Sequence, residues 1–202
     1  MKTQTNNYMK KLFMLALIGL FSGSGLTLRA QDFPGIDKSV MDMSYYPQRA
    51  AFRAFAKTEE ERKSATPVMR VTYSRPLKNE RDVFPDVVKY GEIWRVGANE
   101  STELMLFQDV ELNGTRLEQG RYTLYAVVNE DNWEVHVSTD TDGWGQYAFK
   151  PEESTVAKIT VPTRKTEETI EALGIYFEKM EEGSVHMVIG WDDTMVRVPF
   201  KV

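Results

Sequence analysis

The sequence contains no cysteine. This excludes disulfides, a thiol nucleophile, a thiolate metal ligand and a lipid-anchored lipoprotein. Histidine is nearly as scarce, with His136 and His186 alone. Glu134 and His136 have the spacing of one strand face, but two histidines without a clustered third ligand favour polar strand faces over a metal centre. We therefore assign no metal site and no cofactor.

Sequence motifs for common catalytic sites are also absent. The chain has no P-loop, no GxGxxG, no HExxH and no GxSxG. A pair of carboxylates for glycoside hydrolysis remains open, because the separation of such a pair is spatial rather than sequential. No catalytic residue is assigned.

The first thirty residues have the order of a secretory signal peptide. Lys2, Lys10 and Lys11 form a basic segment, and residues 12–21 (LFMLALIGLF) form an apolar run too short to span a bilayer. Small and polar residues follow as far as Ala30, after which we place the cut. The alternative is a retained N-terminal anchor. We expect a periplasmic or secreted protein.

Removal of residues 1–30 changes the charge balance of the chain. The segment holds four basic residues and no acidic ones, which leaves 21 Lys and Arg against 30 Asp and Glu and a formal charge of −9. Such a charge disfavours nucleic acid and anionic membrane surfaces as partners. We expect no stable membrane insertion after cleavage.

Beyond an extended lead-in over residues 31–48, the pattern predicts one β domain over residues 49–202. Short apolar or alternating runs recur with turn residues between them. The expected strands are 68–73, 102–107, 121–128, 133–137, 156–161 and 170–177, a hairpin over 110–117 with Asn113-Gly114 as its turn, and a closing hairpin of 184–191 and 195–202 with its turn at Asp192-Asp193. About nine short strands predict an all-β fold, a single antiparallel β-sandwich that is jelly-roll-like.

The segment 49–57 (RAAFRAFAK) fits two patterns. Phe52, Phe55 and Ala56 fall on one helical face, whereas alternate residues from Ala50 to Ala56 fall on one strand face. After it, Thr58 and Glu61 have the spacing of a capping box for a short helix, which Pro67 would end.

Four strings together resemble a family of exported bacterial proteins called domain of unknown function 2911. They are Tyr73-Ser74-Arg75-Pro76, the string YGEIWRVGANE over residues 90–100, GRYTLY over 120–125, and WGQY over 144–147 with Trp191 later. The resemblance covers most of residues 41–202 and implies an all-β exported domain with a first strand at 49–57. It implies no established activity, so it transfers no catalytic residue. The segment 79–85 departs from the family pattern, in which small residues, often a glycine, are expected.

The string YGEIWRVGANE and its surroundings hold the candidate binding site. Its expected residues are Arg75, Trp94, Arg95, Asn99, Glu100 and Thr102, with Trp144 at the mouth of the main pocket. Two guanidinium groups and a carboxylate near an indole could bind an anionic or polyhydroxyl ligand. The alternative, which the general behaviour of buried ion pairs favours, is a structural pair of Glu100 with Arg75 or Arg95.

The remaining aromatic residues allow a second recognition surface. Trp133, Trp144, Tyr147, Tyr125 and Trp191 could form a platform for sugars or peptides. Trp133 alternates with Val135 and Val137, which places it in the core. Trp144 lies between Gly143 and Gly145, where core packing is less automatic. Ser138–Gly143 (STDTDG) matches half of a calcium loop, and the incomplete ligand set favours a solvated turn.

These features favour an exported, non-enzymatic binding module. Its expected ligand is a small polar or anionic molecule or a glycan. One alternative is a hydrolase of envelope or extracellular glycans, and another is a structural envelope protein that acts through protein contacts. A concave cleft lined by arginine and tryptophan favours the first, opposed carboxylates the second, and a flat apolar patch the third.

Export generates the first testable prediction. Because the basic segment and the short apolar run precede Ala30, the protein in the native envelope should begin near Gln31. Mass spectrometry of the isolated protein measures its start, and an intact Met1 start in a membrane fraction would contradict the prediction.

Overall fold

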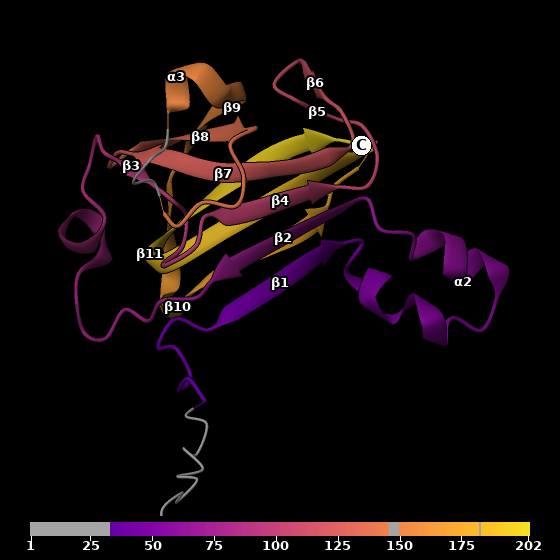
Figure 1. Cartoon of the computed structure of the whole chain (residues 1–202), viewed down its shortest axis with the longest axis horizontal. Coiled ribbons are helices and arrows are strands. Elements are labelled where there is room, and N and C mark those ends of the chain that lie inside the picture. The colour runs from indigo at the N-terminus through magenta and orange to yellow at the C-terminus, as the bar shows by residue number, and fades with distance from the viewer. Residues whose placement is uncertain (1–32, 146–149, 182) are drawn as a thin grey trace, which may run out of the picture. The chain divides into compact units, whose positions relative to one another are not determined.

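The chain forms two antiparallel β-sheets (Figure 1). The computed structural model describes residues 33–145, 150–181 and 183–202, and the expected signal peptide lies outside them. One sheet has the strand order β1-β2-β4-β7-β8-β9, with β3 also paired to β7. Its strands are β1 (Met41–Tyr46), β2 (Met69–Ser74), β3 (Ile93–Trp94), β4 (Thr102–Leu106), β7 (Gly120–Val128), β8 (Asn132–Ser138) and β9 (Thr155–Pro162).

The second sheet has the order β10-β11-β5-β6. Its strands are β10 (Arg164–Lys179), β11 (Ser184–Lys201), β5 (Val110–Leu112) and β6 (Thr115–Leu117). Within the described residues this gives eleven strands, and the expected all-β antiparallel sandwich is confirmed. The hairpin of β5 and β6 turns at Asn113 and Gly114, which both have positive φ, as a tight primed turn requires.

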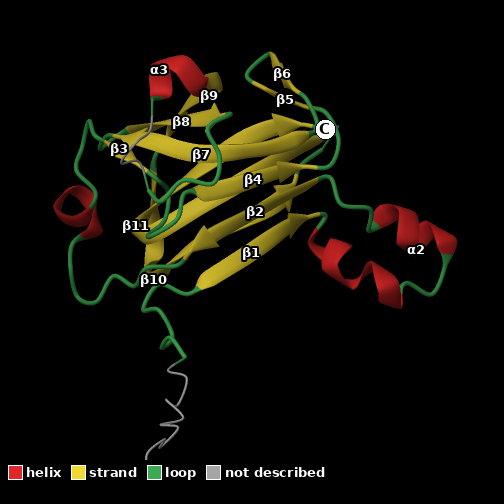
Figure 2. Ribbon diagram, in the orientation of Figure 1, coloured by secondary structure: helices red, strands yellow, loops and turns green. Residues whose placement is uncertain are grey.

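In the described residues, four short helical segments connect the strands (Figure 2). They are the 3₁₀ helix η1 (Gln48–Phe55), the helix α2 (Glu59–Ser64), the π-helical turn η2 (Val83–Val87) and the helix α3 (Pro151–Ser154). The cap expected for α2 forms, since Thr58 Oγ1 accepts a hydrogen bond from Glu61 N at 3.1 Å. The Glu61 carboxylate accepts its own bond from Lys57 N at 2.7 Å, one residue before the usual position.

Two expected elements were wrong. The segment 49–57 is not a first strand, because β1 already occupies the edge beside β2 and the following residues turn into η1. The closing hairpin at Asp192-Asp193 is instead one strand, β11, that stays paired with β10 through register shifts. Asp192 has a φ of +58°, so the irregularity that resembles a turn in sequence is a local distortion within a continuous strand.

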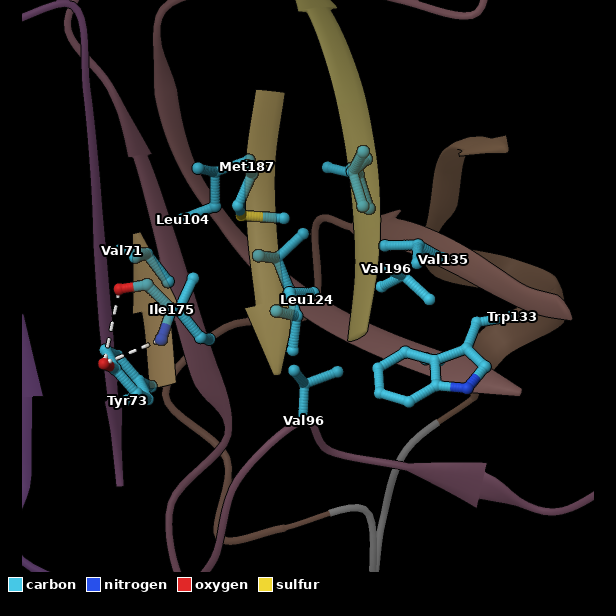
Figure 3. Packing of buried hydrophobic residues seen from close by; sticks show 14 of the residues in the cluster. Val71, Tyr73, Val96, Leu104, Leu124, Trp133, Val135, Ile175, Met187 and Val196 are labelled. Carbon is cyan, nitrogen blue, oxygen red and sulfur yellow. Dashed lines mark hydrogen bonds between the residues drawn. The ribbon is translucent and has the colours of Figure 1, made fainter. Parts of the chain in front are cut away.

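The core lies between the two sheets and draws side chains from both (Figure 3). Leu104, Leu124 and Val135 come from the first sheet, and Met187 and Val196 from the second. These five side chains are buried. One compact unit spans Ile36–Val202, so β1, which falls within the lead-in expected over residues 31–48, belongs to it.

The hydroxyl group of Tyr73 joins β2 to the edge of β10 (Figure 3). It accepts a hydrogen bond from Ile175 N at 2.9 Å and donates one to Ile175 O at 3.3 Å. Burial raises the pKa of Tyr73, so the hydroxyl stays protonated and keeps its donor. One side chain therefore satisfies both backbone groups of a residue at the edge of a sheet.

We predict that Tyr73→Phe destabilises the protein. The substitution leaves the buried N–H and C=O of Ile175 without this partner, at a cost of about 1–3 kcal/mol in the free energy of unfolding. Urea unfolding measures the loss. The matched control is Tyr176→Phe. Tyr176 is exposed, its hydroxyl donates to Glu178 among the described residues, and the loss should stay within about 0.5 kcal/mol. Equal effects of the two substitutions would contradict the role given to Tyr73.

Candidate functional site

A cleft of about 580 Å³ lies beside the loop that joins β3 to β4. Four of the seven expected site residues line it: Trp94, Arg95, Asn99 and Trp144. The other lining residues are Ser39, Pro76, Arg81, Val87, Val88, Lys89, Glu92, Ile93, Gly97, Ala98 and Trp191. Trp144, expected near Trp94 or Arg95, lines the cleft together with both.

Two residues that line the cleft, Trp94 and Trp191, belong to a cluster of packed aromatic rings. Trp94 stacks on Trp191 with ring centroids 6.0 Å apart and an interplanar angle of 19°. Trp133 meets Trp94 edge-on at 5.5 Å, and Phe84 meets it edge-on at 6.0 Å. Since Trp94 is only 7% exposed, its faces are used in packing. Trp94 therefore supports the cleft and offers little ring surface to a ligand, which the sequence did not reveal.

Three side-chain donors fix the loop between Trp94 and Thr102. The bonds are Trp94 Nε1 to Gly97 O (3.3 Å), Arg95 Nη1 to Asn99 O (2.8 Å) and Thr102 Oγ1 to Val96 O (2.8 Å). Val96 and Asn99 have φ values of +54° and +59°, which residues with a Cβ rarely adopt, and these bonds hold them there. Thr102 is fully buried, so its role is structural.

The loop that carries Trp144 is fixed to the start of β4. Ser101 N donates to Gly143 O at 3.0 Å, and Ser101 Oγ donates to Gly145 O at 2.6 Å. Gly145 has a φ of +64°, which favours glycine, and a Cβ there would lie 2.7 Å from Arg95 Nη1 and displace the guanidinium. Trp144 is 58% exposed. A backbone held by two hydrogen bonds thus presents an accessible indole at the cleft.

Arg75, Glu100 and Thr102 do not line the cleft. Arg75 pairs with Asp42 at 3.0 Å and donates from Nε to Leu173 O at 2.9 Å, which ties the end of β2 to β1 and β10. Glu100 is exposed and, in the part of the chain that the structure describes, forms an ion pair with neither Arg75 nor Arg95. The ion pair proposed as an alternative for this cluster is replaced by the pair with Asp42.

The charged residues of the cleft are mostly cationic. Among the described lining residues, Arg81, Lys89 and Arg95 carry positive charge and Glu92 alone carries negative charge. The whole chain has a formal charge of −5, so the cleft is a local exception. Sequence reasoning missed Arg81 and Lys89, although it singled out the segment 79–85 as a departure from the family pattern.

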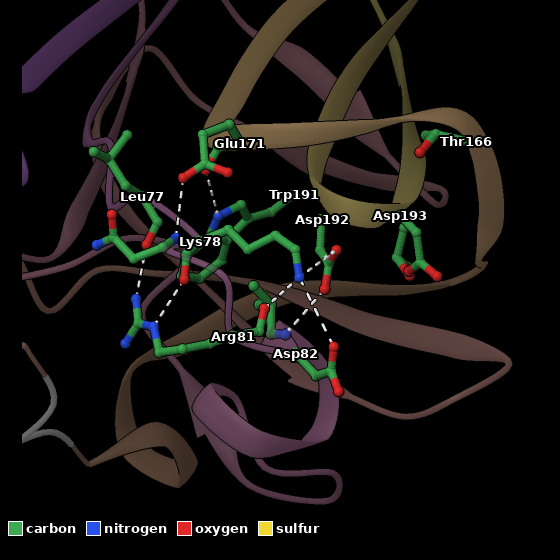
Figure 4. Close-up of polar contacts among 12 residues, drawn as sticks. Leu77, Lys78, Arg81, Asp82, Thr166, Glu171, Trp191, Asp192 and Asp193 are labelled. Carbon is green, nitrogen blue, oxygen red and sulfur yellow. Dashed lines mark hydrogen bonds and ion pairs between the residues drawn. The ribbon is translucent and has the colours of Figure 1, made fainter.

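Arg81 is held in place by backbone oxygens and a neighbouring ion pair (Figure 4). Its guanidinium donates to Lys78 O at 2.8 Å and to Leu77 O at 2.7 Å. Lys78 Nζ lies 3.2 Å from Asp192 Oδ1, and the two side chains are only 15% and 13% exposed. Asp192 Oδ2 also accepts a bond from Val83 N at 3.0 Å. The irregularity in β11 thereby anchors the segment that brings Arg81 to the cleft.

The other aromatic candidates that the structure describes are buried. Trp133 and Trp191 are buried, which confirms the placement of Trp133 in the core. Tyr147 lies outside the described residues. Tyr125 is buried and hydrogen-bonds His136 Nδ1 at 2.9 Å. These residues do not form a shared platform with Trp144 in the described chain, since neither Trp133 nor Tyr125 lines the cleft.

His136 belongs to a hydrogen-bonded chain on the outer face of the first sheet. Its Nε2 lies 2.7 Å from Glu134 Oε1, and its ring stacks on Tyr125 at 4.4 Å. Burial lowers the pKa of His136 despite the nearby carboxylate, so the imidazole is neutral at pH 7. No group of three or more His, Cys, Asp or Glu residues suited to a metal occurs over 33–145, 150–181 and 183–202.

In the segment Ser138–Gly143, the side chains of Ser138 and Asp142 interact with other residues of the chain. Ser138 is buried and donates to Ser154 Oγ at 2.9 Å, whereas the Asp142 carboxylate pairs with Arg121. The hydrogen bond from Arg121 lowers the pKa of Asp142.

No described helix is long and apolar enough to cross a membrane.

The exposure of the four tryptophans yields a prediction. Trp144 is 58% exposed, whereas Trp94, Trp133 and Trp191 are 7%, 1% and 1% exposed. Trp144→Phe should therefore remove most of the fluorescence that acrylamide quenches and leave the protected emission. Trp94→Phe is the control, because it should remove emission that acrylamide reaches poorly. Retention of most quenchable emission in Trp144→Phe would show a shielded indole and contradict the prediction.

Comparison with known proteins identifies a family. No match was found among curated proteins or among solved structures. The model of the family described as protein of unknown function DUF2911 matches residues 56–200, from just after η1 almost to the end of β11. This is more than half of the 202 residues. The chain therefore belongs to the DUF2911 family.

Proposed function

We propose that this protein is an exported, non-enzymatic binding module that holds a small anionic ligand, such as an acidic sugar, in the cleft beside Trp144. The observation that supports this most is the combination of an exposed indole with three cationic side chains and one carboxylate at the same cleft. Arginine and lysine bind carboxylate and phosphate groups, and an indole packs against a sugar ring or another flat group.

The volume of the cleft and the hydrogen bonds that fix its loops are consistent with ligand binding. Its volume of about 580 Å³ lies in the range of small-molecule sites. Hydrogen bonds from Trp94, Arg95 and Thr102 to backbone carbonyls fix the β3–β4 loop on one side of the cleft. A hydrogen bond from Ser101 fixes the loop that carries Trp144. A ligand would therefore meet a largely formed site and would lose little affinity to ordering of the protein.

The hydrolase alternative receives less support from the described carboxylates. A glycosidase needs one carboxyl group whose raised pKa keeps it protonated as a general acid. The described carboxyl groups with a shifted pKa are all shifted downward: Asp109, Glu134, Asp142, Glu178 and Asp193. A hydrogen bond from Arg or Lys is the main cause in four of them. In Glu134 burial raises the pKa, but Lys158 and His136 together outweigh it. These five groups stay ionised at neutral pH and cannot fill that role. The role as a structural envelope protein is the remaining alternative.

Quenching of Trp144 provides the binding test. Galacturonate and inorganic phosphate are the anionic probes, and galactose is the neutral one. We expect the anionic probes to protect Trp144 from acrylamide. Lys89→Glu should weaken that protection by about fivefold or more, because it places a negative charge at the cleft. Arg164→Glu is the matched control, since it makes the same charge change on exposed β10 outside the cleft.

The outcomes separate the alternatives. Protection by galactose alone would favour a neutral glycan over an anion. Protection that Lys89→Glu and Arg164→Glu weaken equally would reflect net charge and contradict a site at the cleft. Untargeted mass spectrometry of molecules retained on the natively purified protein identifies the natural ligand. No protection by any probe, together with no retained molecule, would overturn the proposal.

A further inference from the structure

The 3₁₀ helix η1 exposes two phenylalanine rings. Phe52 is 61% exposed and Phe55 is 77% exposed. The two residues are three positions apart, and a 3₁₀ helix has three residues per turn, so both rings lie on the same side of η1. Within the described chain, Ala50 is the one buried residue of this helix. The rings contribute little to the core and remain available to a partner.

The residues around the rings are basic. Arg49, Arg53 and Lys57 are exposed, and residues 48–57 contain no acidic residue. The next helix, α2, adds Arg62 and Lys63 together with three glutamates, so residues 48–64 carry five basic and three acidic side chains. This region is locally cationic on an acidic chain. In the sequence, Arg49, Arg53 and Lys57 flank the two phenylalanines, and the Arg53 guanidinium donates to Ala50 O at 3.4 Å.

The position of η1 leaves this surface accessible. Figure 2 shows η1 and α2 beyond the end of β1, away from the faces of the sheets. Gln48 Nε2 donates to Phe177 O at 3.2 Å and anchors the start of η1. The family match begins at residue 56, so η1 precedes the matched region. The helix is thus an attachment to the sandwich that carries its own surface chemistry.

We propose that η1 docks on an anionic phospholipid surface. Phe52 and Phe55 enter the boundary between head groups and acyl chains, and Arg49, Arg53 and Lys57 lie against lipid phosphates. Aromatic rings favour this boundary, and cations near an anionic leaflet add to the attraction. The contact is peripheral and needs no membrane-spanning segment.

Charge complementarity selects this partner over a second copy of the chain. In a symmetric dimer through η1, Arg49 and Arg53 of one copy would face the same cations of the other, and like charges oppose such a contact. An anionic lipid surface satisfies the rings and the cations together. The acidic remainder of the chain does not prevent docking, because charges more than about 8 Å from the surface are largely screened at physiological salt.

A local fluorescent probe tests the proposal in the full chain. Because the chain contains no cysteine, Ala54→Cys gives a single site for an environment-sensitive dye on exposed η1, between Phe52 and Phe55 in the sequence. Thr115→Cys on exposed β6 gives the control site. The vesicles contain phosphatidylcholine alone or with phosphatidylglycerol. The local readout separates docking of η1 from any effect of the apolar run at residues 12–21.

We expect the dye at Ala54→Cys, and not the dye at Thr115→Cys, to move to an apolar environment with phosphatidylglycerol vesicles. Phe52→Ser with Phe55→Ser should weaken this binding by about tenfold or more. Arg49→Gln with Arg53→Gln should weaken it by about 25-fold. Val156→Ser, an exposed apolar residue on β9, should leave it unchanged. High salt should reduce binding of the parent chain.

Three results would overturn the proposal. The first is the same dye response with both kinds of vesicle. The second is binding that Phe52→Ser with Phe55→Ser does not weaken although the melting temperature is unchanged. The third is self-association that these substitutions abolish, with no response to either vesicle, which would assign the surface to a second copy. The ligand site at the cleft is unaffected by any of these outcomes, because η1 does not line it.

Discussion

The stacking of Trp94 on Trp191 connects the fold to the cleft. Trp94 lies on β3 of the first sheet and Trp191 on β11 of the second, so their contact joins the two sheets. Trp133 and Phe84 pack around Trp94 and close this part of the core. Of these four rings, Trp94 and Trp191 also line the cleft. The β3–β4 loop begins directly after Trp94, so its position depends on the packing of the core.

Side chains near the cleft either hydrogen-bond the backbone or are exposed at the cleft. Trp94 and Thr102 donate hydrogen bonds to loop carbonyls, and these bonds hold the residues with positive φ in place. Arg95 does so with one nitrogen and also lines the cleft. Trp144 is the opposite case, because its backbone is fixed while its ring is exposed. Because the loop backbone forms its hydrogen bonds within the protein, the exposed groups of the site remain available to a ligand.

Local chemistry was predictable from the sequence, and pairing between distant segments was not. The Asn113-Gly114 turn and the Thr58 cap depend on residues within four positions of one another, and both form. The expected hairpin at Asp192 was wrong because pairing with β10 continues through the distortion. Likewise Arg75 pairs with Asp42, which belongs to a strand hidden in the expected lead-in. Composition cannot reveal such partners, since the register of distant strands decides them.

For the candidate site, sequence reasoning found the indole and one arginine of the cleft but missed Arg81 and Lys89. It also used the net charge of the chain to disfavour nucleic acid and anionic membrane surfaces as partners. Cations nevertheless gather at the cleft and on η1, although the chain as a whole is acidic. With a screening length of about 8 Å at physiological salt, a bound group responds to the charges beside it more than to the total. Net charge thus governs the approach of a partner from a distance, whereas the local arrangement of Arg and Lys decides which group can stay bound.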